Sequence, residues 1–291
     1  MILRLRDDVL ELREPLLMGI LNATPDSFSD PRGHKPLTEL VGRALEQVAA
    51  GAALVDVGGE SGRTDREAVS VEEEISRVGP VVEALAAEAV TVSVDTWRAP
   101  VARAALDAGA AMINDVSGLS EPEVAEDCAR RGAALVITHT RIPPKTKGFP
   151  AYADVVEDVV ALLRERSKDA RSRGIADEQL VLDPGIDLAK TPAESVEVLR
   201  RLPELRALGR PLLLSVSRKD FVGALTDRSP AGRQAGTLAA LGAAVDGGAA
   251  ILRVHDVADA RDYLAVRAAL NGETEVGEEL RLDPGLRRET T

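Results

Sequence analysis

The sequence predicts a single parallel (β/α)8 barrel of the α/β class, and three observations lead to that prediction. Eight short apolar runs alternate with segments of helical length along the 291 residues. A Gly-Ala-Ala phrase recurs four times at the junction of helix and strand, so the architecture repeats. No Gly-x-Gly-x-x-Gly follows the first apolar run, which argues against a dinucleotide-binding sheet. The length suits one barrel of roughly 250 residues with short extensions.

The repeated phrase marks the passage from a helix into the next strand. Each copy begins with Gly, for which left-handed dihedral angles cost nothing just beyond a helix C-terminus. The Ala pair then lets helix and sheet approach closely, and an apolar run follows. The copies occupy residues 51–56, 109–114, 132–137 and 248–253.

The remaining elements follow from the apolar periodicity. Strands are predicted near residues 15–21, 53–57, 90–94, 110–114, 133–138, 179–182, 211–216 and 250–254. Amphipathic helical segments include residues 71–87, 153–173, 192–207 and 232–247. Two helix starts carry capping signals, namely Ser70 with Glu73, and Thr191 and Pro192 with Glu194.

Composition and charge exclude several classes of protein. The formal net charge is −12, from 36 basic and 48 acidic residues, which is the wrong sign for a protein that coats nucleic acid. The single cysteine, Cys128, leaves no intrachain disulfide and fits a reducing compartment. No apolar stretch approaches the roughly 20 residues of a membrane span, and the charged N-terminus lacks a signal-peptide core.

These observations give an expected organisation. We expect a cytoplasmic protein with no nucleic-acid or membrane partner. The barrel is expected over residues 1–270, followed by a polar, frayed tail over residues 271–291.

Polar side chains follow nearly every predicted strand, where a packed barrel interior would favour Val, Ile and Leu. Each one alone could cap a helix or brace a turn. Together they ring one mouth, because the carboxyl ends of parallel strands meet at one end of a barrel. The ring comprises Asn22, Asp56, Asp95, Asn114, His139, Asp183, Ser217, Lys219, Arg253 and His255.

The chemistry of the ring is selective. A flat heterocycle with a donor–acceptor edge needs both acceptors and donors, and a phosphate needs positive charge. The first need is met by Asp95, Asn114, Asp183 and Lys219, and the second by Arg253 and His255. The sequence therefore predicts a binding site at the C-terminal ends of the strands.

Seven ordered blocks resemble the signatures of the dihydropteroate synthase family. Residues 18–30 read Met-Gly-Ile-Leu-Asn-Ala-Thr-Pro-Asp-Ser-Phe-Ser-Asp, and residues 56–61 read Asp-Val-Gly-Gly-Glu-Ser. The other blocks are residues 93–96, 113–118, 183–186, 217–219 and 253–256. They occur in family order and cover about residues 15–270.

The resemblance implies condensation of 6-hydroxymethyl-7,8-dihydropterin diphosphate with p-aminobenzoate, giving dihydropteroate and pyrophosphate in folate biosynthesis. It implies that the pterin is held by Asp95, Asn114, Asp183 and Lys219. It implies that the diphosphate is bound by Asn22, Arg63, Arg253 and His255, with Asn22 also contacting Mg2+. The loops implied to border p-aminobenzoate carry Phe28, Asp30, Ser61, Gly62, Arg63, Leu188 and Ser217. Family members are commonly homodimers.

The family mechanism assigns catalytic work to the same ring. The C–O bond to diphosphate breaks early and leaves a cationic pterin methylene, which the arylamine attacks. Asp95 is implied to stabilise the cation, while Arg253, His255 and Mg2+ stabilise the departing anion, and Lys219 acts beside them.

The sequence departs from the family pattern mainly on the p-aminobenzoate side. Residues 61–64 read Ser-Gly-Arg-Thr where Ser-Thr-Arg-Pro is usual, and residues 186–190 read Ile-Asp-Leu-Ala-Lys where Ile-Gly-Phe-Gly-Lys is usual. Residues 138–142 read Thr-His-Thr-Arg-Ile where Met-His-Met-Arg-Gly is usual, and Pro31 stands where Gly is usual.

Two alternatives remain open at this point. One is a diverged pterin-binding paralogue with a different acceptor or no catalysis. The other is a methyltransferase that passes a methyl group to a corrinoid protein, which has no need of Arg63, Lys219 or the pair Arg253 and His255.

Overall fold

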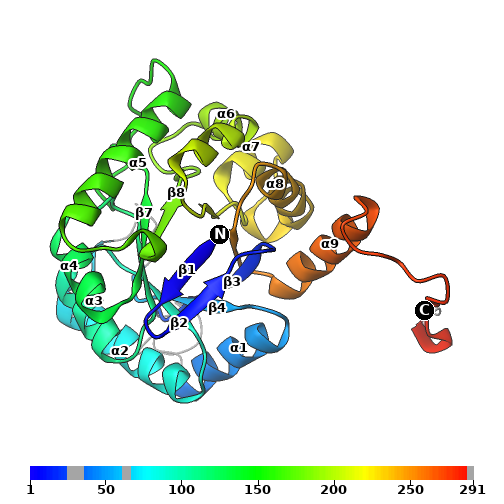
Figure 1. Cartoon of the computed structure of the whole chain (residues 1–291), viewed down its shortest axis with the longest axis horizontal. Helices are drawn as coiled ribbons and strands as arrows, with labels where there is room; N and C mark the ends of the chain where they lie inside the picture. The colour runs from blue at the N-terminus through cyan, green and yellow to red at the C-terminus, as the bar shows by residue number, and fades with distance from the viewer. Residues whose placement is uncertain (25–35, 61–66, 287–291) are drawn as a thin grey trace.

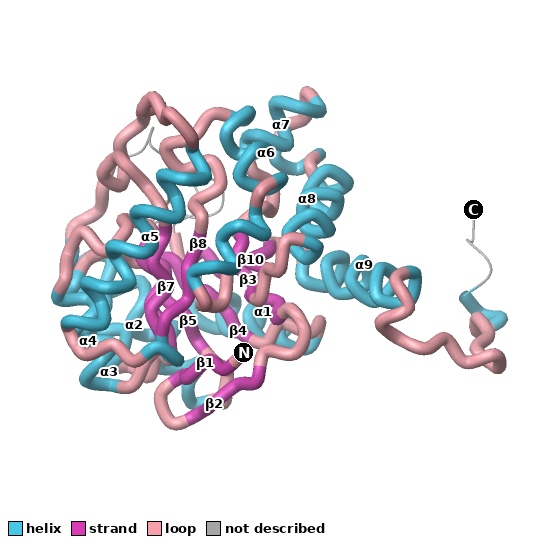
Figure 2. The backbone as a smooth tube through the Cα atoms, turned by 45° about the horizontal axis from the view of Figure 1, so that its top comes forward, coloured by secondary structure: helices cyan, strands magenta, loops and turns pink. Residues whose placement is uncertain are grey.

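The computed structural model of the chain describes residues 1–24, 36–60 and 67–286. Its centre is a sheet of eight parallel strands in the order β8-β7-β6-β5-β4-β3-β10-β9. The two ends of the sheet meet through a parallel bridge between Leu182 and Leu212, and the Leu182 amide donates to the Pro211 carbonyl at 2.9 Å. The sheet is thus a nearly closed barrel with helices outside it (Figure 1, Figure 2). The predicted fold class is confirmed.

Every predicted strand is present, with its ends within two residues of the prediction. The strands are β3 (Leu16–Asn22), β4 (Leu54–Gly58), β5 (Val92–Asp95), β6 (Met112–Asp115), β7 (Ala134–Thr138), β8 (Leu180–Asp183), β9 (Leu213–Leu214) and β10 (Ile251–Val254). The predicted strand 211–216 begins late because Pro211 has no N–H to donate to a ladder.

The helices lie between the strands in sequence. They are α1 (Leu37–Ala49), α2 (Val71–Ala87), α3 (Ala99–Asp107), α4 (Glu123–Arg131), α5 (Val155–Ser172), α6 (Pro192–Arg200), α7 (Asp220–Thr226), α8 (Gln234–Asp246) and α9 (Val257–Leu270). Both predicted caps are confirmed. The Ser70 hydroxyl accepts from the Glu73 amide at 3.1 Å, and Thr191 forms a reciprocal capping box with Glu194.

One predicted helix is wrong in its extent. The segment 192–207 divides into α6 and a 3-10 helix, Leu202–Leu208. Pro203 explains the break, because it lacks an N–H and its ring clashes with the carbonyl four residues earlier.

The glycines of the four repeats have the predicted backbone. Their φ values are +112° at Gly51, +114° at Gly109, +68° at Gly132 and +95° at Gly248. The alanine that follows each of them is buried against the outer side of the sheet. The repeated phrase thus turns the chain from each of these helices into the barrel wall.

Strand alternation divides the core into two clusters. On β4, Val55 and Val57 belong to the large cluster between sheet and helices, whereas Leu54 belongs to a small cluster inside the barrel. This inner cluster also contains one or two apolar residues from most other strands, including Met18 and Met112. The lower lumen is therefore filled with apolar side chains.

An N-terminal hairpin closes the base of the barrel and was not predicted from the sequence. It pairs β1 (Ile2–Leu5) with β2 (Asp8–Glu11) in an antiparallel sheet, and Figure 1 shows it lying across the barrel. Leu3 and Leu5 are 0 % and 2 % exposed and complete the inner cluster. Their alternation with charged residues was the available signal, but four-residue strands are too short to stand out in a charged segment.

Beyond α9 the chain leaves the barrel. The described residues after Leu270 are exposed, and both views show this segment running away from the strands (Figure 1, Figure 2). In the described part of the chain, no helix has both the length and the apolar character needed to cross a membrane.

Candidate active site

The inward-facing polar residues gather at the C-terminal end of the barrel. Asn22, Asp95 and Asp183 are the last residues of β3, β5 and β8. Asp56 lies on β4, Asn114 on β6 and Arg253 on β10. His139 and His255 directly follow β7 and β10, and the loops after β8 and β9 carry Leu188, Ser217 and Lys219. The described members of the predicted ring thus meet at one mouth, except His139, whose wholly buried side chain bonds to Asp158 and Lys190 instead.

Arg253 is the centre of a buried network. Its Nε donates to Asp56 Oδ2 at 2.6 Å, and a terminal nitrogen donates to Asp95 Oδ2 at 2.9 Å. Asn114 Nδ2 donates to the same Asp56 oxygen at 3.1 Å. The side chains of Asp56 and Arg253 are 0 % and 16 % exposed, so this ion pair is shielded from water.

Asp56 belongs to this network, although the sequence-based assignment gave it no role. Asp56, Asn114 and Arg253 each stand five positions after the Gly of a repeat. Because the repeat fixes where each strand begins, the three side chains reach the same depth in the lumen. That common offset was the signal that linked them.

The Asp95 carboxyl group of this network has perturbed acidity. Burial raises the pKa of Asp95 to about 7, with Asp56 and Glu74 adding to the rise and Arg253 and Lys219 opposing it. The buried guanidinium keeps a raised pKa because Asp56 and Asp95 favour its charged form.

Asp183 and Lys219 come from the strand ends that follow β10 around the barrel, Asp183 ending β8 and Lys219 standing beyond β9. Asp183 is 5 % exposed and accepts from the Gly185 amide at 2.7 Å. Burial raises its pKa, and the nearby charges of Lys219, Lys190 and Arg253 oppose that rise. Lys219 is half-buried at the N-cap position of α7. A carboxylate and an ammonium therefore stand close enough to influence each other.

His255 is neutral near pH 7 in this site. Burial and the neighbouring Arg218 and Arg253 lower its pKa to about 4. Its Nδ1 lies 2.9 Å from the Ser217 hydroxyl, which also accepts from the His255 amide at 3.2 Å. Positive charge at this strand end therefore comes from the arginines, and His255 contributes hydrogen bonding.

Arg253 does not pair with the acidic residues that follow it in sequence. Asp256 instead receives hydrogen bonds of 2.8–3.2 Å from Arg218, and Asp259 accepts from Gln234. The lumen, not the adjacent helix, determines where Arg253 points.

Several buried polar atoms of the upper lumen find no hydrogen-bond partner within the described chain. They are Asp56 Oδ1, Ser93 Oγ, Asn114 Oδ1 and Thr138 Oγ1. An unsatisfied buried polar group costs about 1–3 kcal/mol, so such a group calls for a ligand or a bound water. Ser93 and Thr138 were not among the predicted site residues, although each follows the inward alternation of its strand. The upper lumen is thus built for a polar guest.

The remaining predicted residues divide into two sets. Leu188 is half-buried in the loop after β8, and Asn22 exposes its side chain at the mouth. The residues predicted on the first two loops lie outside the described residues: Phe28, Asp30, Ser61, Gly62 and Arg63. The described residues contain no cluster of three His, Cys, Asp or Glu side chains suited to a metal ion.

Comparison with known proteins identifies the family. A family model described as pterin binding enzyme matches residues 18–255. Dihydropteroate synthase of Escherichia coli strain K12 is 42 % identical over 259 residues, covering 88 % of this chain and 92 % of that protein. The chain belongs to the dihydropteroate synthase family.

Solved structures of the family agree with the architecture. The Xanthomonas albilineans dihydropteroate synthase with 4-aminobenzoic acid has a TM-score of 0.86 and 42 % identity, covering 93 % of this chain and 99 % of that one. The Yersinia pestis dihydropteroate synthase with a sulfonamide has a TM-score of 0.87 and 39 % identity, covering 94 % and 100 %.

Proposed function

We propose that this chain condenses 6-hydroxymethyl-7,8-dihydropterin diphosphate with p-aminobenzoate, giving dihydropteroate and pyrophosphate in folate biosynthesis. The observation that carries the proposal is family membership over most of the chain combined with a polar upper lumen. Related structures contain 4-aminobenzoic acid or 7,8-dihydropteroate. The named relatives are synthases, which favours this function over methyl transfer to a corrinoid protein.

The pterin is proposed to enter the lumen edge-on. Its ring edge carries both hydrogen-bond donors and acceptors. Asp95 and Asp183 supply acceptors, Asn114 supplies an acceptor through its unpaired Oδ1, and Lys219 supplies a donor. The apolar lower lumen beneath them stops the ring from sinking further.

The reaction then separates charge along the barrel axis. When the C–O bond breaks, the methylene carbon becomes cationic and the diphosphate leaves as an anion. Asp95 is proposed to stabilise this cation, which the arylamine nitrogen attacks before it loses a proton. No covalent enzyme intermediate is required.

Arg253 can serve both the network and the leaving group. A guanidinium has five N–H donors, and the bonds to Asp56 and Asp95 use two of them. The others are available to the diphosphate, together with the Nε2 side of His255. A bound dianion would also raise the pKa of His255 above its present value of about 4.

Mg2+ fits this site as a partner of the substrate. Magnesium is often held by one or two protein oxygens together with substrate phosphates. Asn22 is an exposed residue with an amide oxygen that suits that arrangement, and bound Mg2+ would supply neutralising charge for the leaving group.

The arylamine is proposed to bind above the pterin. The bordering residues are Phe28, Asp30, Ser61, Gly62, Arg63, Leu188 and Ser217. Loop closure over it would keep water from the cation.

We also propose a cytoplasmic homodimer that contacts neither nucleic acid nor membrane. The solvent-facing side of α8 carries Ala235, Ala239 and Ala243 at helical spacing, which offers a smooth strip for a second copy. Light scattering of the parent and of Ala239→Arg tests this contact, since a large charge there should yield monomers.

The function itself is tested by turnover of pterin diphosphate with labelled p-aminobenzoate. Calorimetry with the pterin then tests the pocket, because Asp95→Ala and Asp183→Ala should each lose about 1–3 kcal/mol per unpaired ligand group. Asp8→Ala, on the exposed hairpin strand, is the control. Unchanged pterin affinity in both pocket variants would overturn the assignment.

A further inference from the structure

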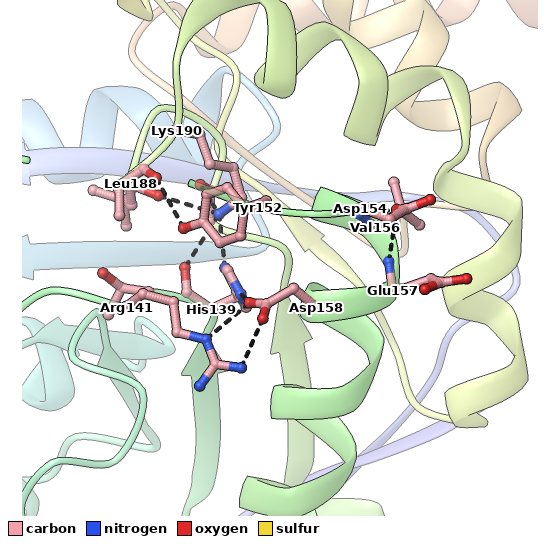
Figure 3. Close-up of polar contacts among 12 residues, drawn as sticks. His139, Arg141, Tyr152, Asp154, Val156, Glu157, Asp158, Leu188 and Lys190 are labelled. Atoms are coloured by element: carbon pink, nitrogen blue, oxygen red, sulfur yellow. Dashed lines mark hydrogen bonds and ion pairs between the residues drawn. The ribbon is translucent and has the colours of Figure 1, made fainter. Parts of the chain in front are cut away.

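Lys190 is a lysine sealed inside the protein just behind the mouth. It lies in the loop that joins β8 to α6, and its side chain is 2 % exposed. Its Nζ contacts the Gly185 carbonyl at 2.9 Å, the Leu188 carbonyl at 3.1 Å and His139 Nδ1 at 2.8 Å (Figure 3). The three donors of an ammonium thus meet three neutral acceptors at short range, two of them within the loop itself, and the His139 carbonyl lies at 3.5 Å.

The contact with His139 continues outward as a series of hydrogen bonds. Because Lys190 is the donor, Nδ1 of His139 accepts, and the proton of the neutral ring lies on Nε2. That atom donates to Asp158 Oδ1 at 2.8 Å, and Asp158 also receives two bonds of 2.8 Å from Arg141. Burial, with the adjacent ammonium, lowers the pKa of His139 to about 4, which agrees with a neutral ring.

This series of hydrogen bonds connects two loops of the mouth. Arg141 follows β7, and Leu188 follows β8. Figure 3 shows Lys190 between the carbonyl-bearing loop and the His139 ring, with Asp158 and Arg141 beyond. A second tie runs in parallel, since the Tyr152 hydroxyl donates to the Ala189 carbonyl at 2.9 Å.

The loop needs such ties because its backbone is strained. Asp187 and Ala189 have φ values of +63° and +53°, in the left-handed region that residues other than glycine rarely occupy. Strained residues persist only where their surroundings hold them. Asp187 is held from the other side, because it accepts from the Ser195 hydroxyl at 3.0 Å and from the Phe221 amide at 3.1 Å.

We propose that Lys190 is a positioning residue for the arylamine substrate, acting through the chain Lys190–His139–Asp158–Arg141. The proposal rests on the function above, in which Leu188 borders the arylamine. Lys190 fixes the carbonyl of Leu188 from behind, so it sets where that side chain stands. It touches neither substrate and takes no part in bond breaking.

The hydrogen bonds from Lys190 to the Gly185 and Leu188 carbonyls do not depend on one protonation state of the lysine. Burial lowers the pKa of Lys190 to about 7, while Asp183, Asp158 and Glu194 favour its charged form and Lys219 disfavours it. A neutral amine keeps two N–H donors and can still hold the Gly185 and Leu188 carbonyls. The effect of removing the side chain should therefore exceed any effect of pH on the parent.

The test compares Lys190→Met, in the loop after β8, with a matched control at the residue just before β8. Gln179 precedes β8, is 4 % exposed and donates to the Ala133 carbonyl at 2.7 Å, so Gln179→Met also removes a buried clamp on backbone carbonyls. We expect Lys190→Met to raise the KM for p-aminobenzoate about tenfold, with kcat and pterin affinity changed by less than about threefold. Gln179→Met should lose stability and leave both affinities near those of the parent.

A second variant covers the case in which Lys190→Met does not fold. Asp158→Asn keeps the shape of the side chain but weakens its bonds to His139 and Arg141, and should shift the p-aminobenzoate KM in the same direction by less. The proposal is overturned if KM stays within about twofold of the control in the variants that fold, or if pterin affinity falls equally. Absence of turnover in the parent would instead refute the proposed function.

Discussion

Replacing Arg253 with Met should destabilise the barrel because of the charges it leaves behind. Met keeps much of the volume and apolar stem of Arg but removes the donors at 2.6 Å and 2.9 Å from Asp56 and Asp95. Asp56 is wholly buried and retains only the neutral amide of Asn114 among its side-chain partners in the described chain. The substitution thus leaves the carboxyl groups of Asp56 and Asp95 close together without the guanidinium that bonds to both.

The expected loss is set by burial. Removing one partner of a buried ion pair costs about 3–5 kcal/mol, because the other charge remains uncompensated. At about 2–4 °C per kcal/mol for a chain near this size, Tm should fall by about 10 °C. An exposed pair provides the contrast. Arg4 and Glu178 lie 2.7 Å apart with side chains 46 % and 35 % exposed, so Arg4→Met should cost no more than about 1 kcal/mol.

The pH dependence gives a sharper test. The pKa of Asp95 in the folded protein, about 7, already lies above its unfolded value, so ionisation of Asp95 lowers stability as pH rises from about 4 through 7. Without Arg253 this pKa rises further and the penalty at neutral pH grows. The difference between variant and parent should therefore shrink when pH falls from about 8 to about 5.

Thermal unfolding followed by circular dichroism at these two pH values measures both effects. The reasoning is refuted if Arg253→Met loses no more stability than Arg4→Met. It is also refuted if the loss is as large at acidic pH as at alkaline pH, since lost packing does not titrate.

Three further predictions follow from other parts of the molecule. Asp187→Gly should relieve the left-handed backbone but remove the side chain that accepts from the Phe221 amide at the start of α7. The pterin affinity measured by calorimetry should therefore fall, whereas Asp187→Asn should retain most of it. Equal affinity in the two variants would show that this hydrogen bond does not position the start of α7. Leu5→Ala should cost about 2–5 kcal/mol in denaturant unfolding, against a change near zero for the exposed Val9→Ala; similar losses would mean that the hairpin does not seal the lumen. Relative to the parent, the double variant Gly62→Thr, Leu188→Phe should bind p-aminobenzoate and sulfonamides more tightly, gaining about 0.5–1.5 kcal/mol from the ring contact; unchanged inhibition constants would show that these positions do not weaken the aryl pocket.

The strands were predictable because their signal is local. A parallel strand covered on both sides reads as a continuous apolar run, and the Gly-Ala-Ala phrase announces where four of them begin. Capping pairs such as Ser70 with Glu73 also act within one turn. The Pro203 break was equally local, and it was missed because the apolar period continues across it.

The N-terminal hairpin at the base of the barrel could not be predicted from local signals. Leu3 and Leu5 are buried by contacts with strands that come much later in the sequence. Their alternation with charged residues is too short to distinguish them from exposed leucines. Lys190 poses the same problem. Lysine is rarely buried. Only where the two loops meet are there carbonyl groups and an imidazole that accept hydrogen bonds from Lys190.

The repeat determines how deep Asp56, Asn114 and Arg253 lie in the lumen. The apolar side chains below them determine which of these residues bond to each other. Because Asp56, Asn114 and Arg253 share one offset from a glycine, the sequence places them at one level. It cannot say which of them will bond, since that depends on what lies below. Apolar side chains closed off by the hairpin fill the lower lumen, so charges at this level lack water on one side and must neutralise each other. Arg253 therefore crosses the barrel to Asp56 and Asp95 instead of turning to the nearby Asp256. A site whose charges are already balanced favours a neutral heterocycle at depth and leaves the anionic diphosphate nearer the mouth, where Arg253 still has donors to offer.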